Sequence, residues 1–441
     1  MDFKDIAASI HTLGCKVNIY ESEVMEGLLL EAGFRMVPFT EKADVYIINT
    51  CSVTNIADRK SRQMLHRARA LNPDAVVVAC GCYAEAEEEE RLLSDGVDLV
   101  IGNEEKGRIV RILEDYLKNG ARPAKSPASK AEAFRPLRHG ALHGHTRADV
   151  KVQDGCSQFC TYCIIAYVRG RIRSRDAEDT VREVEGLVRG GTREIVLTGI
   201  HLSSYGKDLG PGGDLLSLIR AVHEVPGLSR IRLGSLEPRL VTRDFAEALA
   251  ALPKVCPHFH LSLQSGSAKT LKRMNRRYTP EEYAESIRGL RAVYSAPGLT
   301  TDVIVGFPGE TEADFEESMA FVREMAFSDL HVFRYSRRKG TAADRMPDQL
   351  TEAVKAERSR KLIALGEEMS EAFIASLDGK PAEALTEEPA VRDGAEGYTG
   401  YTREYVRVFL PGAAGPNRIV SGILRKGDGT AAEIPVFTEN T

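Results

Sequence analysis

The stretch DGCSQFCTYC, residues 154–163, holds Cys156, Cys160 and Cys163 in the spacing C-x3-C-x2-C. Three thiolates on one loop can ligate three irons of a cubane cluster and leave the fourth iron open to a chelating substrate. Zinc is the rival metal, but a closed zinc site needs four ligands, and no further Cys or His lies nearby at zinc-type spacing. The spacing therefore favours an iron–sulfur cluster with an open iron over zinc and over three unrelated buried cysteines.

Alternating strand-like and helix-like runs surround this loop and predict a parallel sheet that forms a complete or partial barrel. The strand-like runs are residues 149–153, 194–197, 230–233, 258–263, 300–305 and 330–335. The helix-like runs are residues 181–188, 215–225, 244–252, 281–294 and 314–325, and a long helix at about 351–377 follows. Because the cysteine loop follows the first strand, we expect it at the carboxyl end of the barrel, where such folds place their chemistry.

An earlier alternating series predicts a separate α/β domain with its own parallel sheet. Its strand-like runs are residues 9–13, 45–49, 75–79 and 97–101, with a helix-like run at 56–71. Cys15, Cys51 and Cys82 each follow the carboxyl end of one of these strands, where open parallel sheets bind ligands. They could form a second three-ligand site, although three buried core cysteines stay an equal alternative. Cys80 and Cys256 are predicted to pack in the core.

The remaining segments predict a linker and a small C-terminal barrel. Prolines, glycines and seven Lys or Arg against one acid mark the basic stretch at residues 118–147. Short β-rich runs between Gly- and Pro-marked turns predict an antiparallel barrel in the tail. The predicted domains are residues 1–117, a linker at 118–144, a barrel domain at 145–377 and a tail domain at 378–441.

Bulk composition limits the setting in which this chain works. No apolar run reaches the length of a membrane span, and the first residues do not read as a signal peptide, so we expect a cytoplasmic protein without a membrane partner. Eight cysteines in that compartment point to metal ligation rather than disulfides. The net charge of −5 means that any RNA contact needs local basic patches. A monomer is expected.

Six cysteines and the residues around them resemble the radical S-adenosylmethionine (SAM) methylthiotransferases over nearly the whole chain. The stretches that carry the resemblance are TLGCKVN at 12–18, NTC at 49–51, GC at 81–82, residues 154–170 and residues 400–408, the last similar to a TRAM module. Ala166, Arg334 and Glu85 depart from the residues usual in the family. The resemblance implies an α/β protein with an N-terminal parallel domain, a partial (βα)6 barrel and a TRAM-like antiparallel barrel.

Three branches of this family differ in substrate. One acts on N6-threonylcarbamoyladenosine 37 of tRNA, one on isopentenyladenosine 37, and one on an aspartate of a ribosomal protein. The stretches LGCKVN at 13–18, ADRKSRQ at 57–63 and YSRR at 335–338 look most like the threonylcarbamoyl branch. We therefore expect sulfur insertion at C2 of that adenine, giving its 2-methylthio derivative, and keep the other two substrates as alternatives.

The resemblance also implies cofactors and their ligands. Cys156, Cys160 and Cys163 would hold a [4Fe–4S] cluster that cleaves SAM, the radical source and methyl donor. Cys15, Cys51 and Cys82 would hold a second [4Fe–4S] cluster that supplies sulfur. No side chain beyond these six ligands is expected to be catalytic. Candidate SAM contacts lie mostly at strand ends, and they are Tyr162, Thr198, Gly199, Ser235, Glu237, Gln264, Ile304 and Gly306.

RNA contacts are expected from arginines and tyrosines, with the tRNA anticodon stem-loop and an unidentified electron donor as partners. Four arginines occupy every second position, and they are Arg169, Arg171, Arg173 and Arg175. If this segment is extended, they fall on one face that could meet phosphates, with a salt-bridged surface strand as the equal alternative. Arg337 and Arg338 are candidates for binding the threonylcarbamoyl carboxylate. Tail residues Tyr398, Tyr401, Tyr405, Arg403 and Arg407 could stack on unpaired bases or pack in the barrel. From another class, a non-catalytic iron–sulfur RNA-binding protein stays a rival.

Overall fold

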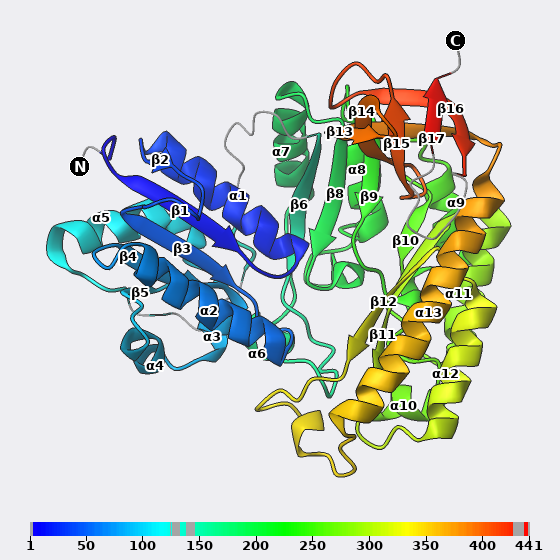
Figure 1. Cartoon of the computed structure of the whole chain (residues 1–441), viewed down its shortest axis with the longest axis horizontal. Helices are drawn as coiled ribbons and strands as arrows, with labels where there is room; N and C mark the ends of the chain where they lie inside the picture. Colours follow the sequence, from blue (N-terminus) through cyan, green and yellow to red (C-terminus); the bar gives the residue numbers. More distant parts are fainter. Residues whose placement is uncertain (1–2, 124, 126–132, 138–145, 427–435, 440–441) are drawn as a thin grey trace.

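A computed structural model gives the fold and describes residues 3–123, 125, 133–137, 146–426 and 436–439. Figure 1 shows an N-terminal sheet layered between helices, a half-barrel of parallel strands beside it, and a small β-barrel at one end of the half-barrel. The predicted linker at 118–144 lies in large part outside the described residues, and the domain limits stay predictions. In the described part of the chain, no helix is long and apolar enough to cross a bilayer.

The N-terminal sheet is parallel throughout, with the order β2-β1-β3-β4-β5. Its strands are β1 (Ala7–Thr12), β2 (Arg35–Met36), β3 (Val45–Thr50), β4 (Val76–Cys80) and β5 (Leu99–Val100). Every residue of β3 is buried, as expected for a central strand with helices on both faces. The strand order reverses between β1 and β3, so a crevice for a ligand lies beyond their carboxyl ends.

Helices cover both faces of this sheet and bury separate apolar cores. One face holds α1 (Lys16–Glu31), the short helix η1 (Lys106–Arg108) and α5 (Ile109–Asn119), and the other holds α2 (Asn55–Leu71), α3 (Gly81–Ala86) and α4 (Glu89–Ser94). Thr54 caps α2 by accepting a hydrogen bond from the Ala57 amide, and Asp58 adds an acid to its first turn. The capped start of α2 fixes the loop that carries Cys51.

Six parallel strands form the predicted partial barrel, divided between a four-stranded and a three-stranded sheet. They are β6 (Arg147–Asp154), β8 (Glu194–Gly199), β9 (Arg230–Leu233), β10 (His258–His260), β11 (Gly298–Val305) and β12 (Asp329–Arg334), with β7 (Arg173–Ser174) antiparallel to β6. Isolated bridges join β9 to β10. Strand β10 is shorter than the predicted 258–263, because beyond His260 the chain keeps only isolated bridges, at Leu261 and Gln264.

Helices alternate with these strands on the outer face and bury the largest apolar core of the described residues. They are α6 (Ile165–Val168), α7 (Ala177–Arg189), α8 (Leu215–His223), α9 (Arg243–Ala250), α10 (Ala268–Arg273), α11 (Pro280–Val293), α12 (Glu312–Met325) and α13 (Glu352–Leu377). Short helices η3 (Leu202–Ser204), η4 (Pro238–Leu240) and η5 (Ala343–Arg345) fill connections. Capping boxes at Thr279 and Thr311 set the starts of α11 and α12. This arrangement confirms the predicted α/β class.

The tail forms a closed five-stranded barrel in the order β13-β14-β15-β17-β16. Its strands are β13 (Pro381–Arg392), β14 (Ala395–Thr402), β15 (Arg407–Pro411), β16 (Ile419–Arg425) and β17 (Val436–Glu439). Neighbouring strands are antiparallel except for β15 with β17, which pair in parallel among the described residues. The barrel sits at the amino end of the half-barrel, where Arg232 at the start of β9 donates to the Thr402 and Arg403 carbonyls.

Candidate active site

The C-x3-C-x2-C loop leaves the carboxyl end of β6 and is folded tightly back on itself. The Cys156 amide donates to the Gly170 carbonyl at 3.0 Å, and the Cys163 amide donates to the Cys160 carbonyl at 3.0 Å. Gly155 has a φ of +71°, and a Cβ there would lie 1.8 Å from the Arg171 carbonyl oxygen, so only glycine fits. Cys156, Cys160 and Cys163 all line one cavity of about 150 Å³.

Residues after α10 hold this loop from the opposite side. The Arg276 guanidinium donates to the Cys160 sulfur at 3.3 Å and lies 4.8 Å above the Tyr278 ring. The Asn275 amide group donates to the Phe159 carbonyl at 3.0 Å. Burial, followed by the neighbouring Cys160, raises the pKa of Cys163 to about 12. An empty site therefore keeps this thiol protonated, and a metal that binds there must displace its proton.

The structure also brings Cys15, Cys51 and Cys82 together beyond the carboxyl ends of β1, β3 and β4. Cys15 is the N-cap residue of α1 and makes no side-chain capping hydrogen bond. Gly14 has a φ of +104°, and a Cβ there would lie 2.9 Å from the Cys51 sulfur. Burial, with smaller effects from Cys82 and Cys15, raises the pKa of Cys51 to about 11. Cys80 and Cys256 are buried core residues, as predicted.

Arg169 links this second cysteine set to the half-barrel. Its guanidinium is fully buried and donates to the Cys82 sulfur at 3.4 Å, to Glu21 at 2.5 Å and to Asn18 at 2.6 Å. Burial alone would raise the pKa of Glu21, but Arg169, Lys106 and Lys151 hold it well below its usual value. Glu21 therefore stays ionised and joins cations from both domains in one buried cluster.

The predicted contact of Arg169 with RNA phosphates is therefore wrong. Arg173 and Arg175 are buried as well, and both are paired with carboxylates. The reason is that their acidic partners lie far away in sequence or on the next helix, where an alternating pattern does not reveal them. Arg171 is the exposed member of the series, and its contact with RNA stays a prediction.

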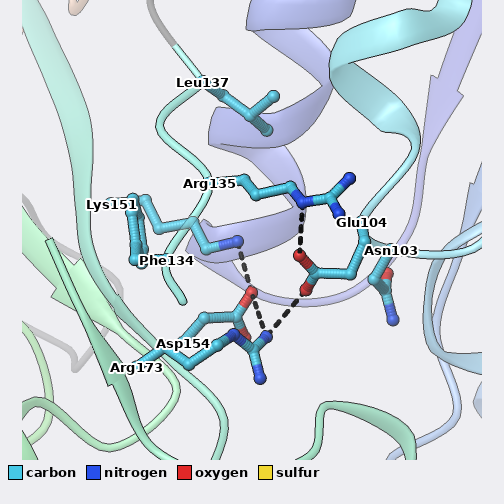
Figure 2. Close-up of a pocket in the computed structure, with 8 residues that line it drawn as sticks. All are labelled: Asn103, Glu104, Phe134, Arg135, Leu137, Lys151, Asp154 and Arg173. Carbon is cyan, nitrogen blue, oxygen red and sulfur yellow. Dashed lines mark hydrogen bonds and ion pairs between the residues drawn. The ribbon is translucent and has the colours of Figure 1, made fainter. Parts of the chain in front are cut away.

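Figure 2 shows a further part of this interface, where the linker crosses between the domains. Arg173 from the half-barrel pairs with Glu104 from the N-terminal domain at 2.8 Å, and linker residue Arg135 lies 3.8 Å from the same carboxylate. Lys151 pairs with Asp154 at 2.5 Å. Buried and partly buried ion pairs of this kind require complementary geometry, so they fix the position of one cysteine set relative to the other.

One larger cavity of about 380 Å³ reaches both cysteine sets, because Cys15 and Cys163 both line it. Apolar side chains make much of its wall, and they are Val53, Ile164, Ile165, Ile200, Ile304 and Phe333. Polar groups are fewer, and they include Ser235, Ser262, Gln264 and Asp302. Mainly apolar walls with a few polar groups are typical of ligand sites. A flat molecule held here would touch both sets.

Six of the eight predicted SAM contacts line one or both cavities. Tyr162, Ser235 and Gln264 line both, Glu237 lines the smaller, and Gly199 and Ile304 line the larger. Thr198 and Gly306 line neither. Thr198 is buried within β8. The Gly306 amide donates to Glu310 at 2.7 Å, and a Cβ there would lie 2.4 Å from the Lys355 side chain, so tight packing explains this glycine.

Sequence reasoning missed several residues of the smaller cavity, among them Gln158, His201 and Arg276. Burial, followed by the charge of Arg276, lowers the pKa of His201 to about 4. His201 is therefore a neutral polar group near physiological pH. The sequence could have indicated His201 as a site residue from its position just past β8, because Gly199, two residues earlier, was predicted from the same strand end.

Arg337 and Arg338 do not line the cavity and are paired with carboxylates of the protein, so the structure does not support their predicted contact with a substrate carboxylate. The Arg338 guanidinium is buried and donates to Asp58, to the Asn55 side chain at 2.9 Å and to the Ser52 hydroxyl. Arg337 is exposed and pairs with Asp344 at 3.0 Å. Arg338 instead connects the loop that follows β12 to the start of α2, next to Cys51.

The tail tyrosines are partly committed to packing. Tyr405 stacks between Tyr401 and His258, with ring centroids 4.6 Å away on each side. Arg232 lies 4.7 Å from the Tyr405 ring, and Arg403 donates to the Pro253 carbonyl at 2.6 Å. These contacts dock the tail barrel on the half-barrel, so Tyr405 is not a free stacking platform for bases. Arg407 is exposed.

A six-stranded parallel half-barrel with a three-cysteine loop at its carboxyl end defines a radical SAM enzyme, a class that binds SAM at a [4Fe–4S] cluster. Residues 150–322 match the radical SAM superfamily, and residues 7–102 match the uncharacterized protein family UPF0004. The chain belongs to the radical SAM tRNA methylthiotransferases, as its resemblance predicted. It is therefore a transferase, and the rival non-catalytic protein finds no support.

Two curated relatives show the closeness of the match. The chain is 41% identical over 407 residues to threonylcarbamoyladenosine tRNA methylthiotransferase MtaB of Bacillus subtilis, covering 92% of this chain and 90% of the relative. It is 39% identical over 368 residues to tRNA-2-methylthio-N(6)-dimethylallyladenosine synthase of Pelotomaculum thermopropionicum, covering 82% of each. Among solved structures, the radical SAM methyltransferase TsrM of Kitasatospora setae shares the fold, with a TM-score of 0.54 and 16% identity over 76% of this chain and 73% of TsrM.

Proposed function

We propose that this enzyme converts N6-threonylcarbamoyladenosine 37 of tRNA to its 2-methylthio derivative with two [4Fe–4S] clusters. The observation that carries the proposal is the single cavity lined by Cys15 at one end and Cys163 at the other. Supporting this, the relative from Bacillus subtilis is named for that substrate. A relative named for the dimethylallyl substrate is nearly as similar, so the substrate itself rests on experiment.

The cysteine sets fit the two proposed clusters. Each set offers three thiols and would leave one iron without a protein ligand. An arginine donates to one sulfur in each set. The cluster at Cys156, Cys160 and Cys163 would supply radical chemistry with bound SAM, and the cluster at Cys15, Cys51 and Cys82 would supply the sulfur.

The protein's own residues would bind SAM, orient the target adenine and exclude water. Ser235, Glu237 and Gln264 present polar groups at the strand ends beside the first set, suited to the amine, carboxylate and ribose of SAM. The apolar residues Ile200 and Ile304 would hold the flat adenine and exclude water. The buried ion pairs between the domains keep the sulfur source and the radical source at a fixed separation, so that the reacting atoms are positioned before reaction.

The direct test uses anaerobically reconstituted enzyme, SAM, a chemical reductant and two anticodon stem-loops that differ only in the modification at adenosine 37. We expect the threonylcarbamoyl stem-loop to gain a methylthio group at the higher kcat/KM, measured by mass spectrometry of its nucleosides. Equal or faster reaction of the isopentenyl stem-loop would refute the substrate and leave the family assignment intact.

Iron content tests the two clusters. The reconstituted enzyme should hold about eight irons per chain, and changing Cys156, Cys160 and Cys163 together to Ala should remove about half. The same triple change at Cys15, Cys51 and Cys82 should also remove about half and abolish methylthiolation, yet leave release of 5′-deoxyadenosine. Full iron content in either variant would refute its set as a cluster site.

A further inference from the structure

A polar cluster outside the cysteine sets lies on the inner wall of the half-barrel. It consists of His260 on β10, Asp302 on β11 and His331 on β12, whose ligand-type atoms all lie within 4.8 Å of one another. The His260 Nε2 and an Asp302 oxygen are 3.2 Å apart, and the two imidazole rings stack with centroids at 5.7 Å. Asp302 is the cross-strand partner of His331, so both side chains leave the sheet on the same face.

This cluster continues the wall of the larger cavity. Asp302 itself lines that cavity. Ile304 and Phe333 lie two residues further along β11 and β12, and both line it as well. Because side chains two apart on a strand share a face, His331, Phe333, Asp302 and Ile304 form one continuous surface. The surface is apolar at Ile304 and Phe333, nearer the carboxyl ends of the strands, and polar at Asp302 and His331, two residues earlier.

The three side chains can donate and accept hydrogen bonds at once. The Thr300 hydroxyl lies 2.9 Å from His260 Nδ1 and orients its ring, which turns Nε2 toward Asp302. His331 is exposed, so one imidazole faces open space beside the carboxylate. Imidazoles can donate to a carboxylate or a carbonyl, and Asp302 can accept from an N–H or a hydroxyl.

We propose that His260, Asp302 and His331 form the subsite that binds the polar substituent on N6 of the target adenine. The inference rests on the proposed function. Reaction at C2 requires that edge of the ring to face the cysteines, and N6 projects from a different edge, away from them. A threonylcarbamoyl group carries a carbamoyl N–H, a hydroxyl and a carboxylate, which match the acceptor and donors of this cluster. A dimethylallyl group offers none of these.

The expected consequence is discrimination between the two modified adenosines. A site built to hydrogen-bond a polar group rejects an apolar analogue, because the analogue covers the polar groups of the site without offering them partners. The discrimination arises on the wall formed by β10, β11 and β12, and not at Arg337 or Arg338, which are paired elsewhere.

The test compares His331→Leu holoenzyme with wild type on threonylcarbamoyl and isopentenyl stem-loops. Loss of one hydrogen bond to a charged group predicts a fall of about tenfold or more in kcat/KM for the threonylcarbamoyl RNA. The isopentenyl RNA should react as well or better, and release of 5′-deoxyadenosine without RNA should be unchanged. The matched control is His66→Leu, an exposed histidine on α2 that lines neither cavity. Because His331 is exposed, the substitution leaves the core intact.

Two outcomes would overturn the subsite. One is an equal change on both RNAs. The other is a stoichiometric zinc ion in wild-type holoenzyme that is lost from His331→Leu, which would identify a metal site instead. Failure of the proposed function is a separate result, since it would appear as a wild-type preference for the isopentenyl RNA. The first of the two outcomes, in which the wild-type preference for the threonylcarbamoyl RNA survives in His331→Leu, would refute the subsite alone.

Discussion

At the scale of single residues, both cysteine sets share one feature, a hydrogen bond from an arginine to a sulfur. An arginine donates to one sulfur of each set, the half-buried Arg276 to Cys160 and the buried Arg169 to Cys82. A cationic donor stabilises negative charge on a sulfur ligand, and hydrogen bonds to sulfur are among the factors that set cluster potentials. We therefore expect these arginines to favour the reduced state of the clusters proposed to bind beside them.

Arg169→Met should lower the reduction potential of the cluster proposed at Cys15, Cys51 and Cys82. Removing a charge-assisted hydrogen bond predicts a shift on the order of 50–100 mV for a one-electron couple. Lys106 and Lys151 remain to neutralise Glu21. A redox titration followed by electron paramagnetic resonance measures the shift, and exposed Arg171→Met serves as the control. An unchanged potential with full iron content would show that Arg169 has only a structural role.

At the scale of elements, the tail barrel is docked through ring stacking and arginine contacts at the amino end of the half-barrel. His258 at the start of β10 lies beneath Tyr405 and is buried. Burial, followed by the charges of Arg232 and Lys16, holds the pKa of His258 well below 6.5. The docked tail therefore requires a neutral imidazole.

This requirement makes stability depend on pH. Because the pKa of His258 is lower in the folded chain than in the unfolded chain, its stabilising effect is complete above about pH 6.5 and is lost as pH falls below that value. One such group removes about 1.4 kcal/mol of unfolding free energy per pH unit between its two pKa values. His258→Gln should show a smaller drop in melting temperature between about pH 7.5 and about pH 5.5 than wild type and the His66→Gln control. An equal drop would refute the role of His258.

We expect any RNA contact of the tail on its exposed face, since Tyr405 and Arg403 are used in docking. Changing exposed Arg407 and Arg418 together to Glu should weaken tRNA binding and reduce its salt dependence by roughly one unit of slope per lost phosphate contact. Binding measured over a range of salt concentrations gives both numbers. Release of 5′-deoxyadenosine should not change. Wild-type affinity and slope in this variant would argue against an RNA-binding role for the tail.

At the scale of the whole molecule, the active site depends on contacts between domains that are distant in sequence. Arg338 from the end of β12 reaches Asp58 and Asn55 on α2, and Arg169 reaches Glu21 on α1. Both contacts lie next to cysteines of the N-terminal set. The separation of the two sets is therefore a property of the interface and not of either domain.

Arg338→Ala should uncouple the two halves of the reaction. It leaves the Asp58 carboxylate partly buried without its cation, which costs about 3 kcal/mol when such a pair is broken on one side. We expect 5′-deoxyadenosine release to persist while methylthiolation falls by about tenfold or more. The control is Arg337→Ala, a change at the neighbouring exposed residue, and this variant should behave as wild type. Parallel loss of both activities would point to a folding defect and contradict the uncoupling.

The sequence alone predicted elements and cysteine sets well, because both are local signals. The six strands of the half-barrel and their helices follow hydrophobic runs, and each cysteine of the N-terminal set follows such a run. Strand β2 was missed since it has only two residues. The errors concern charged residues: nothing near Arg169 or Arg338 in sequence indicates Glu21 or Asp58 as a partner. Long-range pairing of charges emerges only from the packed domains.

The start of α1 has a consequence for assembly. Its N-cap is Cys15, a residue that makes no capping hydrogen bond, so the first amides of the helix lack the side-chain acceptor that a serine or aspartate would supply. An anionic cofactor held by Cys15 would offer that missing acceptor and lie at the positive end of the helix dipole. Cofactor binding at Cys15 would therefore add stability to the first turn of α1. The apoprotein would then have a less stable start of α1 than the finished enzyme, a physical difference by which a quality-control system could tell them apart.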